Sequence, residues 1–419
     1  MSTEFEPKSP ALKALKERGF IDAMTDAKAI DDAFDQGMVT FYVGYDPTAS
    51  SLHAGSLTCI MVQRLLQRLG HKPIVLLGGG TARVGDPTGR TESRKMLTEE
   101  TLAANVAGIR RNFDGFLHFD SAQPNDAVML DNYAWLGGLH YLEFLRDIGS
   151  QFTVNRMIAA KTYRDRLDNE QPLSFLEFNY QLLQAYDFLH LYREHGCTMQ
   201  LGGSDQWGNM VAGTELIRRS GHPPAQALTW PLLLTADGRK MGKTADGAIW
   251  LDPAQCKPFD YYQYWVTCHD DDVRNHLLKY TDLPVEEVDA LCQAQGAALR
   301  DVKARLALEA TTLAHGAEAA AAAAAGAKQA FSGGGDWSAV PAVELGVATI
   351  GLLDLVVHPD VGAFKSKREA RQRIEAGAVK IDDQPVKDLS FVLEASAYAD
   401  GTARLQAGKK KRFRIVLSD

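Results

Sequence analysis

Short apolar runs alternate with longer amphipathic segments between residues 39 and 234. A strand buried in a parallel sheet reads as a short apolar run, whereas a covering helix reads as an amphipathic segment. The apolar runs predict strands at residues 39–45, 73–77, 127–131, 198–201 and 228–234. The amphipathic segments predict helices at residues 53–69, 98–113, 139–148, 173–194 and 204–219. The pattern predicts an α/β domain with a parallel sheet.

The chain changes character twice after this domain. Residues 258–331 show no strand signal and contain the alanine run 319–325, which predicts a helical unit because alanine loses no side-chain entropy in a helix. A Ser-Gly-Gly-Gly sequence at 332–335 then predicts a flexible linker. We therefore expect a parallel-sheet domain, a connecting loop, a helical domain, a linker and a small α+β domain, at residues 1–235, 236–257, 258–331, 332–351 and 352–419.

The charge distribution restricts where nucleic acid can bind. The 419 residues carry a net charge of -8, which argues against a generally basic surface. The last 69 residues nevertheless hold 13 Lys and Arg against 10 Asp and Glu, while the rest of the chain holds 32 against 43. Basic residues gather at 365–373 and 409–414. Either group alone is also explained by a solvated face, but two groups behind a linker favour RNA binding.

Cysteine usage and hydropathy indicate the compartment. The five cysteines include no Cys-x-x-Cys pair, so they support neither a disulfide framework nor a zinc knuckle. The N-terminus is charged before any apolar run, and no uncharged stretch approaches the ~20 residues that span a bilayer. We expect a cytoplasmic protein without a membrane segment or a resident metal site.

Residues 42–56 contain the first segment with candidate chemistry. They leave a predicted strand, turn through Asp46-Pro47-Thr48 and enter a helix near His53 and Gly55. A helix N-terminus offers free N–H groups and a positive dipole end to a phosphate. Thr48 and His53 can donate hydrogen bonds, and Gly55 lets a nucleotide approach the backbone. A capped helix with a histidine near its start explains the same residues.

Residues 238–244, Gly-Arg-Lys-Met-Gly-Lys-Thr, form the second segment. Two lysines three positions apart beside glycines predict a mobile cationic lid, suited to the charge that develops on a departing pyrophosphate. An exposed basic loop is the alternative.

Together, the two segments resemble the two signatures of class I aminoacyl-tRNA synthetases, in the expected order. Residues 42–57, 78–90, 180–187 and 202–209 extend this into a resemblance to bacterial tyrosyl-tRNA synthetases over nearly the whole chain. Residues 365–381 resemble the small RNA-binding domain of ribosomal protein S-four type. The sequence departs from the common family pattern at Val43, Ser56, Arg90, Gly242 and Thr244.

The resemblance implies a Rossmann-like catalytic domain in which ATP activates L-tyrosine before its transfer to tRNA(Tyr). The attacking carboxylate is already ionised at pH 7, so no general base is required. The residues implied in phosphate contacts and catalysis are Thr48, His53, Arg90, Arg94, Lys240, Lys243 and Thr244. The residues implied in ATP binding are Asp46, His53, Gly55, Ser56, Gly203, Asp205 and Lys243. Mg²⁺ would arrive with ATP.

The resemblance also implies the tyrosine and tRNA contacts. Tyr42 and Asp187 would meet the phenol hydroxyl. The ammonium group would meet Asp86, Tyr180 and Gln184, with Gln206 nearby. RNA would contact Lys365, Lys367, Arg368 and Arg371. The helical domain would bind the anticodon, and the family implies a homodimer without a DNA or membrane partner.

Two alternatives stay open at this point. A tryptophanyl-tRNA synthetase shares both signatures, although Tyr42 and Asp187 supply a site for a hydroxyl. A non-catalytic RNA-binding relative would have kept the fold and lost activation, although Thr48, His53, Lys240 and Lys243 are intact.

Overall fold

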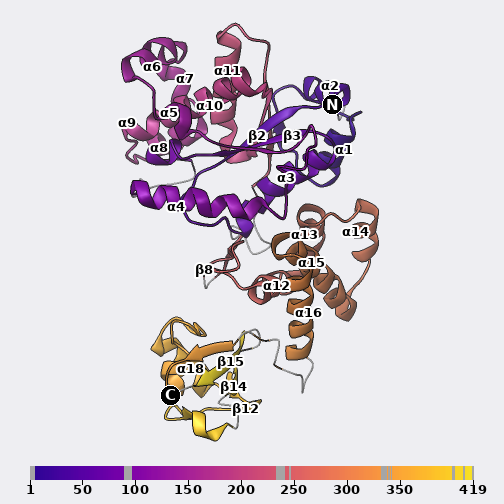
Figure 1. The fold of residues 1–419 in the computed structure, drawn as a ribbon, viewed down its shortest axis with the longest axis vertical. Helices are drawn as coiled ribbons and strands as arrows, with labels where there is room; N and C mark the ends of the chain where they lie inside the picture. Colours follow the sequence, from indigo (N-terminus) through magenta and orange to yellow (C-terminus); the bar gives the residue numbers. More distant parts are fainter. Residues whose placement is uncertain are drawn as a thin grey trace. The chain divides into compact units, whose positions relative to one another are not determined.

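The computed structural model describes residues 5–88, 97–232, 241–244, 247–331, 337, 340, 342–398, 402–408 and 411–417. The chain divides into two compact units (Figure 1). The first comprises residues 1–243, 248–256 and 268–302, and the second comprises 244–247, 257–267 and 303–419. In the described part of the chain, no helix is long and apolar enough to cross a membrane.

A six-stranded sheet forms the core of the first unit, in the order β1-β6-β5-β2-β3-β4. The strands are β1 (Ala23–Met24), β2 (Thr40–Tyr45), β3 (Lys72–Leu77), β4 (Val128–Asp131), β5 (Met199–Gly203) and β6 (Gln226–Trp230). All neighbours are parallel except β1, which runs antiparallel to β6. A strand lies at each of the five predicted places, although β6 starts two residues before the predicted 228–234 and ends at Trp230, and residues 233 and 234 lie outside the described residues. The predicted α/β parallel sheet is confirmed.

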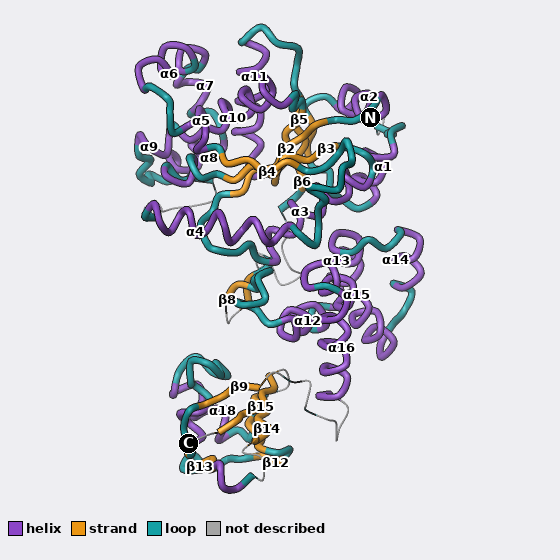
Figure 2. Tube along the Cα trace, in the orientation of Figure 1, coloured by secondary structure: helices purple, strands orange, loops and turns teal. Residues whose placement is uncertain are grey.

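Helices lie around this sheet, and the strands run between them (Figure 2). They are α1 (Pro10–Glu17), α2 (Ala27–Gln36), α3 (Leu57–Arg68), α4 (Glu99–Arg110), α5 (Tyr133–Leu136), α6 (Tyr141–Asp147), α7 (Val154–Met157), α8 (Lys161–Asp168), α9 (Phe175–Phe178), α10 (Tyr180–His195) and α11 (Trp207–Arg219). Side chains next to the first turn cap the N-termini of several of these helices. Thr98 caps α4 through the backbone N–H of Thr101, and Ser174 and Glu177 form a capping box at α9.

The carboxyl ends of β2, β3, β4 and β5 meet at one edge of the sheet. The chain turns there through Asp46, Gly78, Asn132 and Ser204. Gly78 leaves room at its turn for Asp46, because a Cβ atom there would lie 2.4 Å from Asp46 Oδ1. Ligands of parallel α/β sheets bind beyond this edge, so it positions the candidate site.

The predicted helical segment contains α12 (Pro258–Val266), α13 (Val273–Tyr280), α14 (Val285–Leu291), α15 (Leu299–His315) and α16 (Ala317–Phe331). α13 and α14 belong to the first unit, and α15 begins there before continuing into the second. α12 packs against α16. The helical character predicted from the alanine-rich composition is confirmed.

The C-terminal part of the second unit contains a five-stranded sheet in the order β12-β11-β14-β15-β9. Its elements, together with the pair β10 and β13, are β9 (Ala342–Leu345), β10 (Thr349–Gly351), α17 (Leu352–Leu355), α18 (Lys367–Glu375), β11 (Val379–Ile381), β12 (Gln384–Pro385), β13 (Val392–Glu394), β14 (Thr402–Ala407) and β15 (Lys411–Leu417). Ser366 caps α18, and Gly377 follows the helix at φ +71°. The residues that resemble an RNA-binding domain thus form a basic helix, a glycine at its end and a strand.

The segment assigned to the linker contains two strands. Within residues 332–351, β9 pairs parallel with β15 and β10 pairs antiparallel with β13. A flexible linker over this whole range is therefore wrong. These strands have three or four residues and depend on partners about 40 or more positions away, so the local pattern does not reveal them. The Gly333–Gly335 sequence itself lies outside the described residues.

Candidate active site

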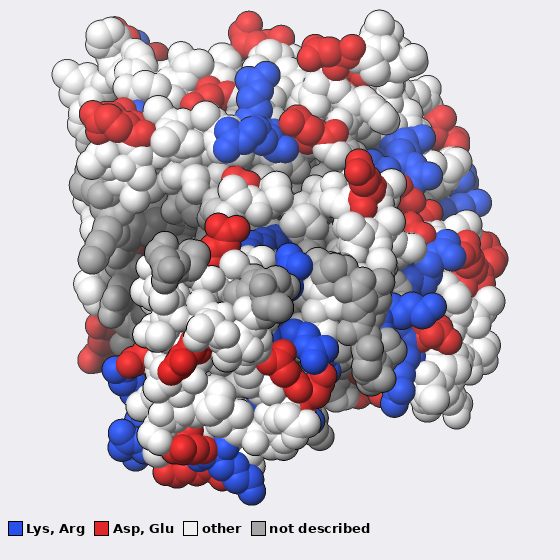
Figure 3. All heavy atoms as spheres, turned by 60° about the horizontal axis from the view of Figure 1, so that its bottom comes forward, with Lys and Arg blue, Asp and Glu red and all other residues white. Residues whose placement is uncertain are grey.

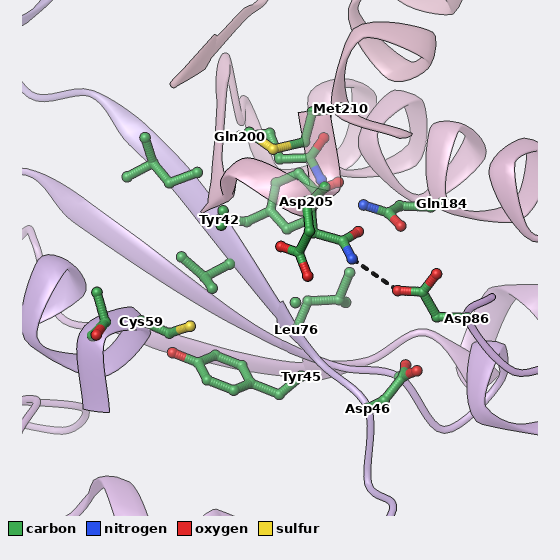
Figure 4. Close-up of a pocket in the computed structure, with 18 of the residues that line it drawn as sticks. Tyr42, Tyr45, Asp46, Cys59, Leu76, Asp86, Gln184, Gln200, Asp205 and Met210 are labelled. Atoms are coloured by element: carbon green, nitrogen blue, oxygen red, sulfur yellow. Dashed lines mark hydrogen bonds between the residues drawn. The ribbon is translucent and has the colours of Figure 1, made fainter. Parts of the chain in front are cut away.

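A cavity of about 460 Å³ opens beyond the carboxyl ends of β2, β3 and β5 (Figure 4). Its walls come from segments far apart in the sequence, and most of the predicted tyrosine and ATP contacts lie among them. The predicted residues that line it are Tyr42, Asp46, His53, Gly55, Asp86, Tyr180, Gln184, Asp187, Gly203, Asp205 and Gln206.

One end of the cavity carries a buried carboxylate beside a buried phenol. Asp187 is 2% exposed and Tyr42 is 1% exposed. Asp187 accepts hydrogen bonds from Trp135 Nε1 at 2.7 Å and from Asn132 Nδ2 at 2.8 Å. The Tyr42 hydroxyl is buried and has no hydrogen-bond partner among the described residues. Since a buried polar group without a partner is costly, this end suits a ligand hydroxyl.

Sequence reasoning missed Asn132 and Trp135. The backbone N–H of Gly80 donates to Asn132 Oδ1 at 2.7 Å, which turns the amide Nδ2 toward Asp187. The Trp135 ring stacks on His190 with centroids 4.2 Å apart. Asn132 directly follows β4 at the ligand edge of the sheet, and that position is a usable signal. Trp135 lies in the four-residue helix α5, where no local pattern marks it.

The environment of Asp187 changes its acidity. Burial raises the pKa of this carboxyl to about 7, the charges of Asp46 and Asp131 act in the same direction, and the hydrogen bonds from Asn132 and Trp135 oppose them. The carboxyl therefore changes charge near neutral pH, and its ionised form is the better acceptor for a phenol hydroxyl.

Acceptor oxygens gather at a second place in the cavity. Asp86 accepts a hydrogen bond from Gln206 Nε2 at 2.8 Å, the dashed contact in Figure 4. Tyr180 Oη lies 3.5 Å from Asp46 Oδ1. Gln184 Oε1 is buried and has no partner among the residues that the structure describes. This set suits an ammonium group, and Asp46, predicted as an ATP contact, lies within it.

The start of the helix after β2 faces the same cavity. His53 Nδ1 accepts the backbone N–H of Gly55 at 3.0 Å, so Nε2 carries the proton in the neutral ring. Gly55 was predicted to let a nucleotide approach. A Cβ atom there would lie 2.6 Å from the carbonyl oxygen of Met241, so this glycine first accommodates the backbone of the lysine-containing loop.

The other predicted residues lie elsewhere. Among those described, exposed Thr48 and half-buried Ser56 do not line the cavity. Lys243 and Thr244 form the short strand β7 (Lys243–Thr244), which pairs with β8 (Gly247–Ala248). The predicted RNA contacts Lys365, Lys367, Arg368 and Arg371 are all exposed. Outside the described residues lie Arg90, Arg94 and Lys240.

Comparison with known proteins identifies the family. Residues 35–332 match the class I tRNA synthetases for tryptophan and tyrosine, and residues 335–415 match the SYY-like C-terminal domain of tyrosine–tRNA ligase. The chain is 49% identical to tyrosine–tRNA ligase of Zymomonas mobilis over 403 residues, or 96% of this chain and 97% of that protein. It is 47% identical to tyrosine–tRNA ligase of Beijerinckia indica over 422 residues, which cover 100% of both chains.

A solved structure agrees with these matches. A C-terminally truncated mitochondrial tyrosyl-tRNA synthetase of Aspergillus nidulans superimposes with a TM-score of 0.69 at 30% identity, covering 77% of this chain and 95% of that one. The C-terminal domain and the full-length relatives are both of the tyrosine type, so the tryptophan alternative is not supported. The chain therefore belongs to the class I tRNA synthetases and, among them, to the tyrosine–tRNA ligase family.

Proposed function

We propose that this chain activates L-tyrosine with ATP to form tyrosyl-adenylate and pyrophosphate, and then transfers tyrosine to tRNA(Tyr) in the cytoplasm. The observation that carries the proposal is the buried end of the cavity. Asp187 is held there by two donors and faces a cavity beside the Tyr42 hydroxyl, which has no partner among the described residues. An apolar side chain would leave the Tyr42 hydroxyl without a partner, whereas the phenol hydroxyl of tyrosine would pair with it and with the carboxylate of Asp187.

Activation requires the tyrosine carboxylate to attack the α-phosphorus of ATP, forming a P–O bond while the bond to pyrophosphate breaks. With the phenol at Asp187 and the ammonium at Asp86, Tyr180 and Gln184, the substrate carboxylate would face the helix start at His53. His53 Nε2 would donate to a phosphate oxygen, and Lys243 would stabilise the charge on pyrophosphate. Mg²⁺ would arrive with ATP, and carboxylates such as Asp205 line the cavity where the nucleotide would bind.

ATP–pyrophosphate exchange with each of the twenty amino acids in turn tests this proposal. Exchange should depend on tyrosine and be weaker by several orders of magnitude with phenylalanine, which lacks the hydroxyl; tyrosyl-tRNA synthetases themselves supply the known magnitude of such rejection, ~10⁵. Exchange with no amino acid would favour the non-catalytic RNA-binding relative, and exchange with tryptophan alone would contradict the assignment of Asp187.

The tRNA contact is proposed for α18 and the residues before it. Lys365, Lys367, Arg368 and Arg371 are exposed, and the carboxylate of Asp354 pairs with Lys367 at 2.5 Å. On the face drawn in Figure 3, Lys and Arg lie among Asp and Glu, without one continuous basic surface. A local group of cations is therefore better suited to RNA phosphates than this face as a whole.

Alanine at Lys365, Lys367, Arg368 and Arg371 together is expected to lower tRNA affinity at least tenfold and to flatten its salt dependence, because fewer counterions are released on binding. Tyrosine-dependent pyrophosphate exchange should stay unchanged. The matched control removes four exposed cations from the first unit, Lys13, Lys28, Arg146 and Arg218. Equal tRNA affinity and salt dependence in the two variants would show that α18 is only a solvated face.

Homodimerisation is proposed for the surface of the short helices α5 to α9. Eight of the fourteen exposed large apolar side chains in the described residues lie there, at Tyr133, Tyr141, Leu142, Val154, Ile158, Leu167, Phe175 and Leu176. Such a concentration is typical of an interface, and the family resemblance implies a second copy. Leu142→Asp with Phe175→Asp is expected to convert a dimer into a monomer in sedimentation velocity. Leu69→Asp, an exposed leucine outside this surface, should not.

A further inference from the structure

Three buried side chains from distant parts of the first unit meet at the wall of the cavity, which Thr58 and Met241 also line. Tyr280 is the last residue of α13, Thr58 lies in the first turn of α3, and Met241 lies between the two lysines of the loop. Tyr280 Oη is 3.0 Å from Thr58 Oγ1 and 2.9 Å from Met241 Sδ. Since thioether sulfur only accepts, Tyr280 donates to Met241, and Thr58 then donates to Tyr280. The three residues are between 1% and 6% exposed.

The backbone next to Met241 packs directly against the start of the helix that follows β2. Gly242 has φ +80°, and a Cβ atom there would lie 2.1 Å from the backbone nitrogen of Gly55. The carbonyl of Gly242 accepts from Ile249 N at 3.0 Å, and the carbonyl of Ile249 accepts from Ala54 N at 2.7 Å. The chain that enters Lys243 is therefore fixed to the segment that carries His53.

Tyr280 is itself held at a fixed place. The guanidinium of Arg18 donates to the carbonyl oxygens of Leu278, Thr281 and Leu283 at 2.7, 3.1 and 2.7 Å. Arg64 pairs with Asp282 at 2.6 Å. These contacts attach the end of α13 to α1 and α3. The Tyr280 hydroxyl at this helix end is therefore a donor in a fixed position. Met241, by contrast, is an unbranched side chain with many rotamers, and a directional hydrogen bond selects among them.

We propose that Tyr280 is a positioning residue for tyrosine activation. Its hydroxyl fixes Met241 against Thr58 and thereby sets the position of the backbone that leads into Lys243, relative to His53. The inference rests on the proposed role of Lys243 in activation. It predicts that loss of the hydroxyl alone, with the ring retained, impairs the chemical step and leaves the tyrosine site intact.

Tyr280→Phe in the full-length protein is expected to slow single-turnover adenylate formation about three- to tenfold, the range of one hydrogen bond, with unchanged tyrosine affinity. Transfer from preformed adenylate to tRNA should keep its rate. Tyr262→Phe is the matched control, because Tyr262 is 3% exposed and its hydroxyl donates to the carbonyl of Ala304, at 3.5 Å, in the helical region. An equal loss in both variants would mean that Tyr280 has a general structural role.

A double-mutant cycle tests the contact itself. Met241→Leu keeps the side-chain volume and removes the sulfur acceptor, so it breaks the same bond as Tyr280→Phe. The double variant should be no slower than the slower single variant, and fully additive losses would overturn the inference. Thr58→Val, which removes the other hydroxyl with little change of shape, should slow the same step.

Lys243→Ala separates the inference from the proposal on which it rests. If Lys243→Ala slows activation while Tyr280→Phe does not, Lys243 acts without positioning by Tyr280 and the inference is wrong. If Lys243→Ala has no effect on activation, the proposed role of the loop is wrong and the inference fails with it.

Discussion

Replacing Lys243 by alanine is expected to slow tyrosyl-adenylate formation by about a hundredfold or more, while tyrosine binding stays nearly unchanged. Attack on the α-phosphorus moves negative charge onto the leaving pyrophosphate, and a cation there acts on charge that is greatest in the transition state. The preceding residue, Gly242, is held against Gly55 at the helix start. Single-turnover kinetics and equilibrium tyrosine binding on the same preparation separate the two effects.

Lys28→Ala is the control for this experiment. Lys28 is an exposed lysine of α2 that pairs with Asp32, so its loss removes one positive charge from the same unit without touching the cavity. It should leave both the rate and the affinity unchanged. If Lys243→Ala lowers tyrosine affinity as much as it lowers the rate, the loop is a substrate clamp and transition-state stabilisation is the wrong description.

The parallel sheet was predictable because burial on both faces leaves a strong local signal. Four of the six residues of β2 and five of the six residues of β3 are buried, so each strand reads as a short and mostly apolar run. The edge strand β1 has only two residues and exists through its pairing with β6, so no local pattern marks it. β9 was missed for the same reason, since its partner β15 lies about 70 positions away.

The residues of the candidate site likewise fall into those that a local sequence pattern predicts and those that only the fold brings together. His53 and Gly55 belong to a strand-turn-helix segment, and Tyr180, Gln184 and Asp187 share one face of α10, so both groups carry a local signal. Trp135 and Asp187 are 52 positions apart in the chain, and they meet only because the fold brings α5 beside α10. The role of Met241 as an acceptor likewise depends on contacts that form in space, so sequence spacing alone does not reveal it.

Asp187→Asn is expected to lower the ratio of kcat/KM for tyrosine over phenylalanine by at least about a hundredfold. Asn132 Nδ2 and Trp135 Nε1 both donate to this side chain. An asparagine has one acceptor oxygen, so one of these donors loses its partner or the amide turns its own N–H₂ toward the substrate hydroxyl. An unpaired buried donor costs ~1–3 kcal/mol, and the charged acceptor for the phenol is lost as well.

The pH dependence of binding and a comparison with Asp86 test the proposed role of Asp187. Because burial raises the pKa of Asp187 to about 7, the fraction ionised increases through neutral pH. Tyrosine affinity in the unmodified protein should therefore rise through about pH 7 and level off about one pH unit higher, and the tyrosine-to-phenylalanine ratio should follow. Asp187→Asn should abolish this dependence on pH.

Asp86→Asn should lower the affinity for tyrosine and for phenylalanine equally, because both amino acids carry the ammonium group proposed to meet Asp86. An unchanged ratio in Asp187→Asn, or a ratio that falls equally in Asp86→Asn, would show that Asp187 does not read the hydroxyl.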